Sequence, residues 1–248
     1  MKNISWLFVI VLFCACDSEN APDCFQKGGD TIRKEFEVSG FSRILVNPNI
    51  EMIIKQGNEF SVYVETGENL LEEVSAVVEN ERLILNNTND CNLVRSFKQT
   101  TFYVTAPDIT EIRSATQFDI ASEGVLSFPS LGILSEDFGE DTGSTNGTFH
   151  LTIDNNRVSV VGNNVASFFL EGKTKALSIN IASGTGRFEG ERFIADDVSV
   201  FHRGANKVIV HPVNKLSGEI RSTGDLIAVN RPDEVAVEVF FTGKLLFQ

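Results

Sequence analysis

Four acidic residues near the middle of the chain have the type and spacing that most directly indicate chemistry. They are Glu136, Asp137, Glu140 and Asp141, and glycines stand at positions 139 and 143. Carboxylate oxygens on a flexible loop are the ligands that Ca²⁺, a hard cation, prefers. The spacing does not reproduce an EF-hand loop, and acidic loops are usually only solvated. We therefore expect no metal site and no cofactor, and keep these four residues as calcium candidates.

Histidine is the second residue type that could support chemistry. The chain has three of them, His150, His202 and His211. In a stacked β-structure His202 could lie beside Asp196 or Asp197, where the pair would act as acid and base. No serine or cysteine nucleophile with an ordered partner can be placed beside them, and a histidine next to an arginine in a turn is more often an exposed polar residue. We therefore expect no catalytic residue.

Two cysteines, Cys24 and Cys91, lie further along the chain than Cys16. In an exported chain two thiols form a disulfide more often than a metal site, because the compartment is oxidising and no His or Cys lies at ligand spacing. We expect Cys24 to pair with Cys91, which would fix the base of the N-terminal segment to the first strands. The alternative is two separate thiols.

The segment 1–15 has the pattern of an export signal. Lys2 gives a positive start, residues 4–13 form a hydrophobic core too short to span a membrane as a mature helix, and Ala15 is a small residue before Cys16. This pattern resembles a bacterial lipoprotein signal, in which Cys16 becomes the acylated first residue. The rival position, Cys14, follows a bulky residue that suits cleavage poorly.

Residues 16–30 are expected to form a lipidated, acidic tether. The acidic residues after Cys16 look like the signal that some bacteria use to display lipoproteins on the outer face, and the alternative is a simple solvated tether. The formal net charge is −13, and removal of the segment 1–15, which holds one lysine, makes it −14. A chain with this negative charge repels nucleic-acid phosphates, so we expect no nucleic-acid partner.

The rest of the chain, residues 31–248, is expected to be one all-β domain. Residues 31–108 alternate apolar and polar side chains between turn formers, as strands with one buried face do. A hairpin closed at Asn80-Glu81 and one helical turn over residues 69–74 are expected within this region. No segment has the longer helical period of an α/β fold.

Residues 109–232 repeat at a period of about 20 residues, which predicts a parallel β-solenoid. Each repeat has a strand, a small polar turn and a second strand. The apolar column that aligns the repeats consists of Ile112, Ile133, Val158, Leu177, Val198 and Leu216. One rung cannot bury its apolar face alone, so several must stack. Residues 233–248 are the expected C-terminal capping strands, and residues 31–108 the N-terminal β-sheet region.

Phenylalanine dominates the aromatic residues, with 20 Phe against two Tyr and one Trp. Carbohydrate platforms more often use Trp or Tyr, so most Phe residues are expected in the core. Phe168 and Phe169 are adjacent and cannot both point inward. One of them is expected to be exposed or to lie at a corner, which favours protein contact over glycan binding.

Several segments together resemble a known family. They are residues 41–46 (Phe-Ser-Arg-Ile-Leu-Val), 50–57 (Ile-Glu-Met-Ile-Ile-Lys-Gln-Gly), 69–71, 83–85, the Val-Thr-Ala-Pro strand end at 104–107 and the repeated Ser-Gly-x-Gly-like turns. Their order is similar to that of the putative auto-transporter adhesin, head GIN domain family. The resemblance implies a right-handed parallel β-helix, a bacterial envelope location and a non-catalytic adhesion role. The turns at 162–164 and 202–204 depart from the pattern.

These observations lead to one expected function and two alternatives. The expected function is that of a non-catalytic outer-membrane lipoprotein, surface-exposed or periplasmic, that acts as an adhesin or binding scaffold for a protein or glycan ligand. A polysaccharide lyase or hydrolase on the same scaffold is the first alternative, by analogy of fold alone. A periplasmic module that associates with copies of itself is the second.

Overall fold

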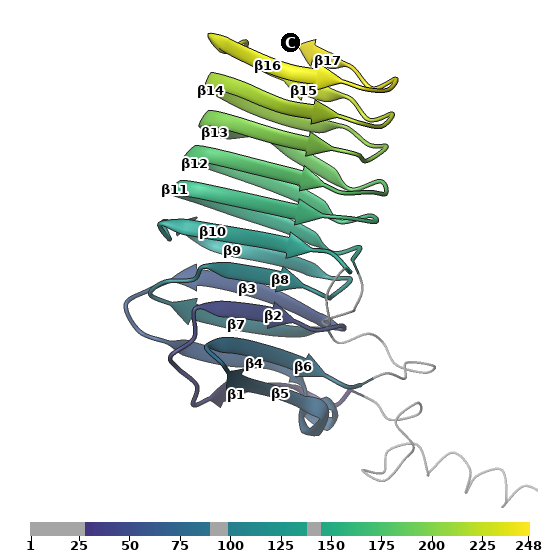
Figure 1. Cartoon of the computed structure of the whole chain (residues 1–248). Helices are drawn as coiled ribbons and strands as arrows, with labels where there is room; N and C mark the ends of the chain where they lie inside the picture. The colour runs from purple at the N-terminus through teal and green to yellow at the C-terminus, as the bar shows by residue number, and fades with distance from the viewer. Residues whose placement is uncertain (1–27, 90–98, 138–144) are drawn as a thin grey trace, which may run out of the picture.

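The structure is a computed structural model, and it describes residues 28–89, 99–137 and 145–248. Its strands form one continuous hydrogen-bonded sheet of 17 strands. This sheet bends repeatedly, so that its strands stack along two faces that enclose the core (Figure 1). We call them the front and back faces, as they lie in Figure 1. The all-β class expected from the sequence is confirmed.

The back face consists, in order along the stack, of β1 (Thr31–Phe36), β4 (Ser61–Gly67), β7 (Thr100–Ala106), β3 (Ile50–Gln56), β9 (Asp119–Leu126), the first halves of β11 (Thr148–Gly162), β12 (Ser167–Ile181), β13 (Arg187–His202) and β14 (Val208–Ile220), then β15 (Leu226–Ala228) and β17 (Leu245–Phe247). The front face consists of β5 (Val74–Glu79), β6 (Arg82–Asn87), β2 (Arg43–Val46), β8 (Glu111–Ser114), β10 (Ser130–Ser135), the second halves of β11 to β14, and β16 (Glu234–Val239). A 3₁₀-helix, Glu68–Glu73, links β4 to β5 at the position of the expected helical turn.

The later strands pair in parallel, each with the strand of the next repeat. Val158 pairs with Leu177, Leu177 with Val198, and Val198 with Leu216, as the apolar column predicts. One step of the expected column is wrong, because Ile133 pairs with Val160, and Leu131 pairs with Val158. The segment between β10 and β11 is longer than the other turns and hides the true register in the sequence.

Parallel pairing extends beyond residues 109–232 in both directions. β2 and β3 pair in parallel with β8 and β9, so an early part of the chain lies directly under the repeats. At the other end, β16 and β17 pair in parallel with β14 and β15 and continue the stack by one more layer. Among the described strands, antiparallel pairs occur only at the first end, where β1, β4 and β7 pair on one face and β5 and β6 on the other.

The core lies between the two faces and is filled by the inward residues of each strand. Phe149, Phe168 and Phe188 follow one another in successive back-face strands and are fully buried. The rings of Phe149 and Phe168 stack with centroids 5.2 Å apart. Each buried ring contributes roughly 1.5–3 kcal/mol relative to exposure. These contacts form only between neighbouring layers, so they hold the stack together.

The turn at Asn80-Glu81 closes the expected hairpin. Both residues have positive φ, 50° and 61°. This is the conformation of a two-residue type I′ turn, which matches the twist of the strands it joins. β5 and β6 pair antiparallel on either side of it. The local prediction for this segment is therefore confirmed.

Candidate binding surfaces

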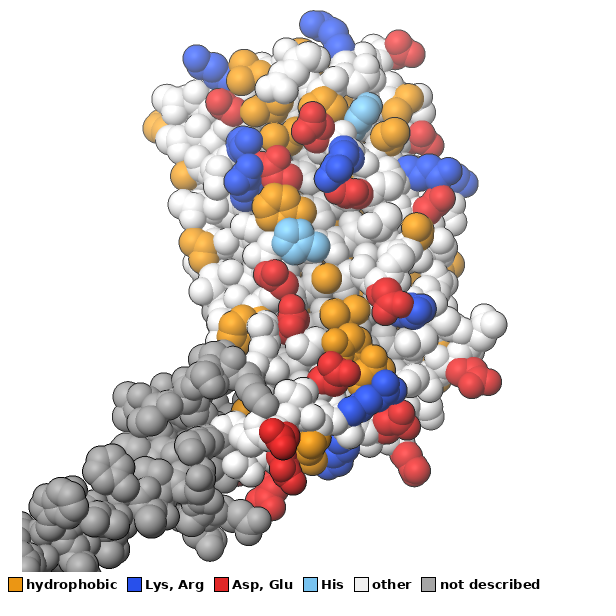
Figure 2. Space-filling view, turned by 180° about the vertical axis from the view of Figure 1, so that it is seen from behind, with side chains coloured by type: hydrophobic (Ala, Val, Ile, Leu, Met, Phe, Trp, Pro, Cys, Tyr) orange, Lys and Arg blue, Asp and Glu red, His pale blue; other side chains and the backbone are white. Residues whose placement is uncertain are grey.

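One column of outward residues runs along the back face from β4 to β17. Strand register links its members, and on the edge strand β1 the residue opposite Tyr63 is Glu35. We call it the back-face stripe, and in stacking order it consists of Tyr63, Tyr103, Ile53, Ala121, His150, Phe169, Glu189, Ile209, Ile227 and Leu246. Figure 2 shows hydrophobic side chains gathered in a line down the middle of this face. Glu189 is the one carboxylate in the stripe, and it forms ion pairs with Arg187 and Lys207.

The aromatic residues of the stripe stack face to face across neighbouring strands. Tyr63 and Tyr103 have centroids 4.5 Å apart at an interplanar angle of 8°. His150 and Phe169 have centroids 4.9 Å apart at 11°. The outer face of Tyr63 is covered by the guanidinium of Arg33, 3.5 Å from the ring centroid. Both faces of Tyr63 and one face each of Tyr103, His150 and Phe169 are thus covered, so the stripe presents ring edges and aliphatic side chains together with the remaining ring faces.

Polar groups border the stripe on the first half of the stack. The Tyr103 hydroxyl donates a hydrogen bond to Glu65 Oε2 at 3.3 Å, and Thr101 Oγ1 donates one to Glu51 Oε2 at 2.7 Å. Burial, and then the negative charge of Glu65, raise the pKa of Tyr103 above its usual value. The phenol therefore stays neutral and remains a donor at neutral pH. An apolar strip with a polar border has the composition of a protein-contact surface.

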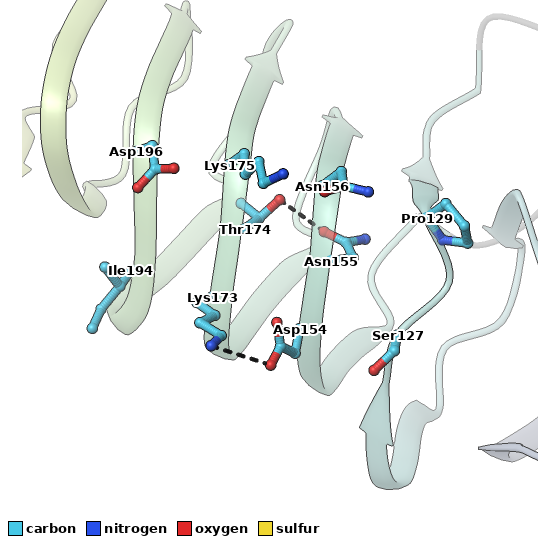
Figure 3. A pocket seen from close by; sticks show the side chains of 10 residues that line it. All are labelled: Ser127, Pro129, Asp154, Asn155, Asn156, Lys173, Thr174, Lys175, Ile194 and Asp196. Carbon is cyan, nitrogen blue, oxygen red and sulfur yellow. Dashed lines mark hydrogen bonds and ion pairs between the residues drawn. The ribbon is translucent and has the colours of Figure 1, made fainter.

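A second surface lies at the bend where the long strands pass from the back face to the front face. It is a groove of about 450 Å³ that crosses β11, β12 and β13 (Figure 3). Asp154, Lys173 and Ile194 form one lip, and Asn156, Lys175 and Asp196 form the other. Asn155 and Thr174 form the floor between the lips, and Ser127 and Pro129 close one end.

The floor of this bend groove is fixed by internal hydrogen bonds. Thr174 Oγ1 donates to Asn155 Oδ1 at 2.7 Å, and Asn155 Nδ2 donates to the carbonyl oxygen of Phe128 at 3.0 Å. On the first lip Lys173 Nζ lies 3.5 Å from Asp154 Oδ2. Within the described residues, nothing bonds to the side chains of Asn156, Lys175 or Asp196. The second lip therefore has unused donors and acceptors above a rigid floor.

The sequence predicted neither surface, although it singled out Asp196, which lies in the bend groove, and His150, which lies in the stripe. Both surfaces arise from register, which brings together residues about 20 positions apart, such as Asp154 and Lys173, or 68 apart, such as Ile53 and Ala121. The one available signal was the pair Phe168 and Phe169. As expected, one ring is buried, that of Phe168, and the other lies half-buried in the stripe.

The two described members of the acidic cluster have protein partners. Glu136 is buried and forms an ion pair with Arg113. Asp137 accepts hydrogen bonds from the side-chain amides of Asn163 and Asn164, and these bonds, the one from Asn164 first, lower its pKa. The structure thus uses Asp137 to hold the turn between β11 and β12, and Glu136 to bind Arg113 of β8. In the described ranges there is no group of three or more His, Cys, Asp or Glu residues that could hold a metal ion.

Five further residues with expected roles lie outside the described residues. They are Cys16, Cys24, Cys91, Glu140 and Asp141. Lipidation, the disulfide and the outer half of the calcium candidate site therefore stay predictions. In the part of the chain that is described, no helix has the length and apolar character needed to cross a bilayer.

The structure does not bring His202 together with either aspartate. His202 points into the core, where it is fully buried, and it pairs in register with Ile181 and Ile220. Asp197 is exposed at the start of the same front-face segment, five residues away, which corresponds to about 16 Å along a strand. Asp196 lies in the bend groove. The acid and base arrangement considered for these residues is therefore wrong.

Comparison with solved structures supports the fold. A putative adhesin from Bacteroides fragilis is 16% identical, has a TM-score of 0.78, and the match covers 90% of this chain and 99% of the other. A putative adhesin from Parabacteroides merdae is 14% identical, with a TM-score of 0.64 and coverage of 90% and 98%. A putative lipid binding protein from Parabacteroides distasonis is 13% identical, with the same TM-score and coverage.

Among curated proteins, none is significantly similar to this chain. The family model for the putative auto-transporter adhesin, head GIN domain, matches residues 40–232. This match includes β2 to β15 and therefore most of the stack. The chain belongs to the head GIN domain family of putative auto-transporter adhesins.

Proposed function

We propose that this chain is a non-catalytic, lipid-anchored protein of the bacterial cell envelope that binds a partner protein through the back-face stripe. The observation that carries the proposal is the unbroken register of outward residues from Tyr63 to Leu246, of which one is a carboxylate. A surface of this kind extends with every added layer. Its length suits a contact with another large molecule.

A protein is favoured as the partner over a glycan at this surface. Sugar rings stack on the open faces of aromatic side chains, and here every ring has at least one face covered by a neighbouring ring, with the second face of Tyr63 covered by Arg33. Ring edges and aliphatic groups with a polar border are suited to packing against the side chains of another protein. The membership of a family described as adhesins supports the same role.

The anchor and the handedness of the stack complete the proposal. Cys16 would carry the lipid, and residues 17–30 would hold the domain away from the membrane. The stack would be a right-handed β-helix, because connections between parallel strands of one sheet are right-handed in about 98% of cases. Non-catalytic function is supported by the separation of His202 from Asp197 and by the protein partners of Glu136 and Asp137.

Adhesion of beads that carry the full chain would test the proposed contact. Beads would be added to cells of the same bacterium and to cultured epithelial cells, each with and without prior trypsin treatment. We expect Tyr103→Ser and Phe169→Ser to lower the number of bound beads about tenfold, as loss of a central aromatic contact does. Trypsin treatment of the target cells should have the same effect.

Ser178→Asn is the matched control, because Ser178 is exposed on the front face. This variant should leave adhesion unchanged. Equal adhesion of the wild type and the two stripe variants would contradict the proposal. Adhesion that survives trypsin would show that the partner is not a protein.

A further inference from the structure

The bend groove has a chemical character that differs from that of the stripe. Its charged side chains balance, with Lys173 and Lys175 against Asp154 and Asp196, although the chain as a whole carries a net charge of −13. Its apolar groups are Pro129 and Ile194, which lie on different sides of the groove (Figure 3). A ligand for it must therefore combine many hydrogen-bonding groups with small apolar patches and carry no net charge.

Other classes of ligand fit less well. A phosphate or an anionic lipid head group would need an excess of positive charge, and Asp154 and Asp196 cancel that of the lysines. A divalent cation would need converging carboxylates, and within the described segments no such cluster of three occurs. A hydrophobic ligand would need a mostly apolar, enclosed pocket. The lips of this groove are instead dominated by charged and amide side chains.

The unused polar groups are arranged in a row across successive strands. Asn156, Lys175 and Asp196 follow one another on β11, β12 and β13, and neighbouring strands lie about 4.8 Å apart. The row therefore offers an amide, an ammonium and a carboxylate at regular intervals along one lip. Hydroxyl groups both donate and accept, so they can pair with all three.

The floor and the end wall supply shape. Thr174 is buried, and its hydrogen bond to Asn155 holds the floor in place without a ligand. Ile194, 44% exposed, and Pro129 give C–H surfaces on which the apolar side of a sugar ring can lie. From the connection at Ser127 to β13 the groove crosses three strand spacings, or about 14 Å. This length suits a short oligosaccharide.

We propose that the bend groove is a binding site for an uncharged oligosaccharide, separate from the back-face stripe. Asn156, Lys175 and Asp196 form hydrogen bonds with its hydroxyl groups, and Ile194 and Pro129 contact its C–H faces. The Lys173–Asp154 ion pair keeps the opposite lip neutral. The site does not depend on the stripe, so the two surfaces can be tested independently.

Saturation-transfer NMR with the full chain tests this site. The probes are four neutral trisaccharides, namely maltotriose, cellotriose, mannotriose and chitotriose, with trigalacturonate as an acidic probe and the peptide Gly-Ser-Gly-Ser as a neutral peptide. We expect at least one neutral trisaccharide to bind at concentrations up to about 10 mM, the weak end of specific recognition. Lys175→Ala and Asp196→Ala should each weaken that binding about 3- to 10-fold, because each removes a hydrogen-bond partner.

Asp233→Ala and Lys244→Ala are the matched controls. They remove the same two charges at exposed positions of the last layer and should leave binding unchanged. Asn156→Ala, an uncharged change in the same row, should weaken binding as the other groove variants do. The proposal is overturned if no neutral trisaccharide binds, if the groove variants bind as the wild type does, or if only trigalacturonate or the peptide binds.

Discussion

His202 is a titratable residue that lies in an apolar environment. Its side chain is fully buried in an apolar column, and neither ring nitrogen has a hydrogen-bond partner in the described residues. Burial lowers the pKa of His202 below its usual value of 6.5, and the nearby backbone of Asn206 and the charge of Asp225 oppose this only in part. The folded state therefore favours the neutral imidazole.

This pKa shift predicts a pH-dependent stability. The unfolded chain binds a proton at His202 near pH 6.5 and the folded chain only at lower pH, so the contribution to stability is complete above pH 6.5 and is lost as the pH falls below it. We expect the melting temperature to fall between pH 7 and pH 5. In the variant His202→Ile the new side chain matches Ile181 and Ile220 in the same column. The melting temperature of this variant should fall less over that pH range.

Thermal unfolding of both proteins at several pH values checks this prediction. His211→Gln is the control, because His211 is only half-buried and its Nδ1 lies 2.9 Å from the carbonyl oxygen of Glu191. Its melting temperature should depend on pH as that of the wild type does. If the melting temperatures of the wild type and His202→Ile fell equally with pH, the lowered pKa of His202 would not be the cause of the pH dependence.

Phe168 and Phe169 form a second test at the residue scale. Phe168 is fully buried against Phe149, so Phe168→Ala should lower the free energy of unfolding by about 3–5 kcal/mol. Phe169 lies on the surface and stacks on His150, so Phe169→Ala should cost at most about 1 kcal/mol. Urea denaturation measures both values. Equal losses would mean that inward and outward positions are wrongly assigned.

At the scale of single elements, one position of β12, beside a bulge in β13, requires glycine. Register between β12 and β13 shifts between Phe169 and Gly172, and Gly172 has a φ of 101°. A Cβ atom there would lie 2.1 Å from the carbonyl oxygen of Ile153. The neighbouring strand therefore leaves no room for a side chain.

Gly172→Ala should lower the free energy of unfolding by about 2–3 kcal/mol, through backbone strain and this close contact. Gly132→Ala is the comparison, because its Cβ atom would have its nearest neighbour at 3.4 Å, an ordinary contact. That variant should stay within about 0.5 kcal/mol of the wild type. Similar stability of the two variants in urea would contradict the strained geometry.

Local patterns in the sequence predicted individual strands and turns better than they predicted which strands lie side by side. The hairpin at Asn80-Glu81 and the period of the later strands depend on nearby residues, and the structure agrees with both. The position of β2 between β6 and β8, and that of β3 between β7 and β9, depend on contacts between distant segments, which no period reveals. The stripe depends on that placement, so Tyr63, Tyr103 and Ile53 could not be joined to His150 from the sequence.

For the whole molecule, stacking makes surfaces that are long in one direction. Each layer contacts mainly the layers before and after it, so a column of outward residues such as the stripe continues along the back face from β4 to β17 (Figure 2). The first end of the stack has antiparallel strands, and its edge strand β1 holds Arg33, Lys34 and Glu35. Charged side chains on an edge strand oppose pairing with other chains. Contact through a face is therefore favoured over contact through this end.

The proposed adhesion to other cells requires that this domain is displayed on the outer face of the cell. Protease treatment of intact cells of the native bacterium that produce the full chain, followed by detection with an antibody to the domain, tests it most directly. We predict that the domain is digested while periplasmic control proteins survive, and that it is protected when Cys16→Ala prevents anchoring and display. Survival of the wild-type domain on intact cells would place it in the periplasm and contradict the proposed adhesion.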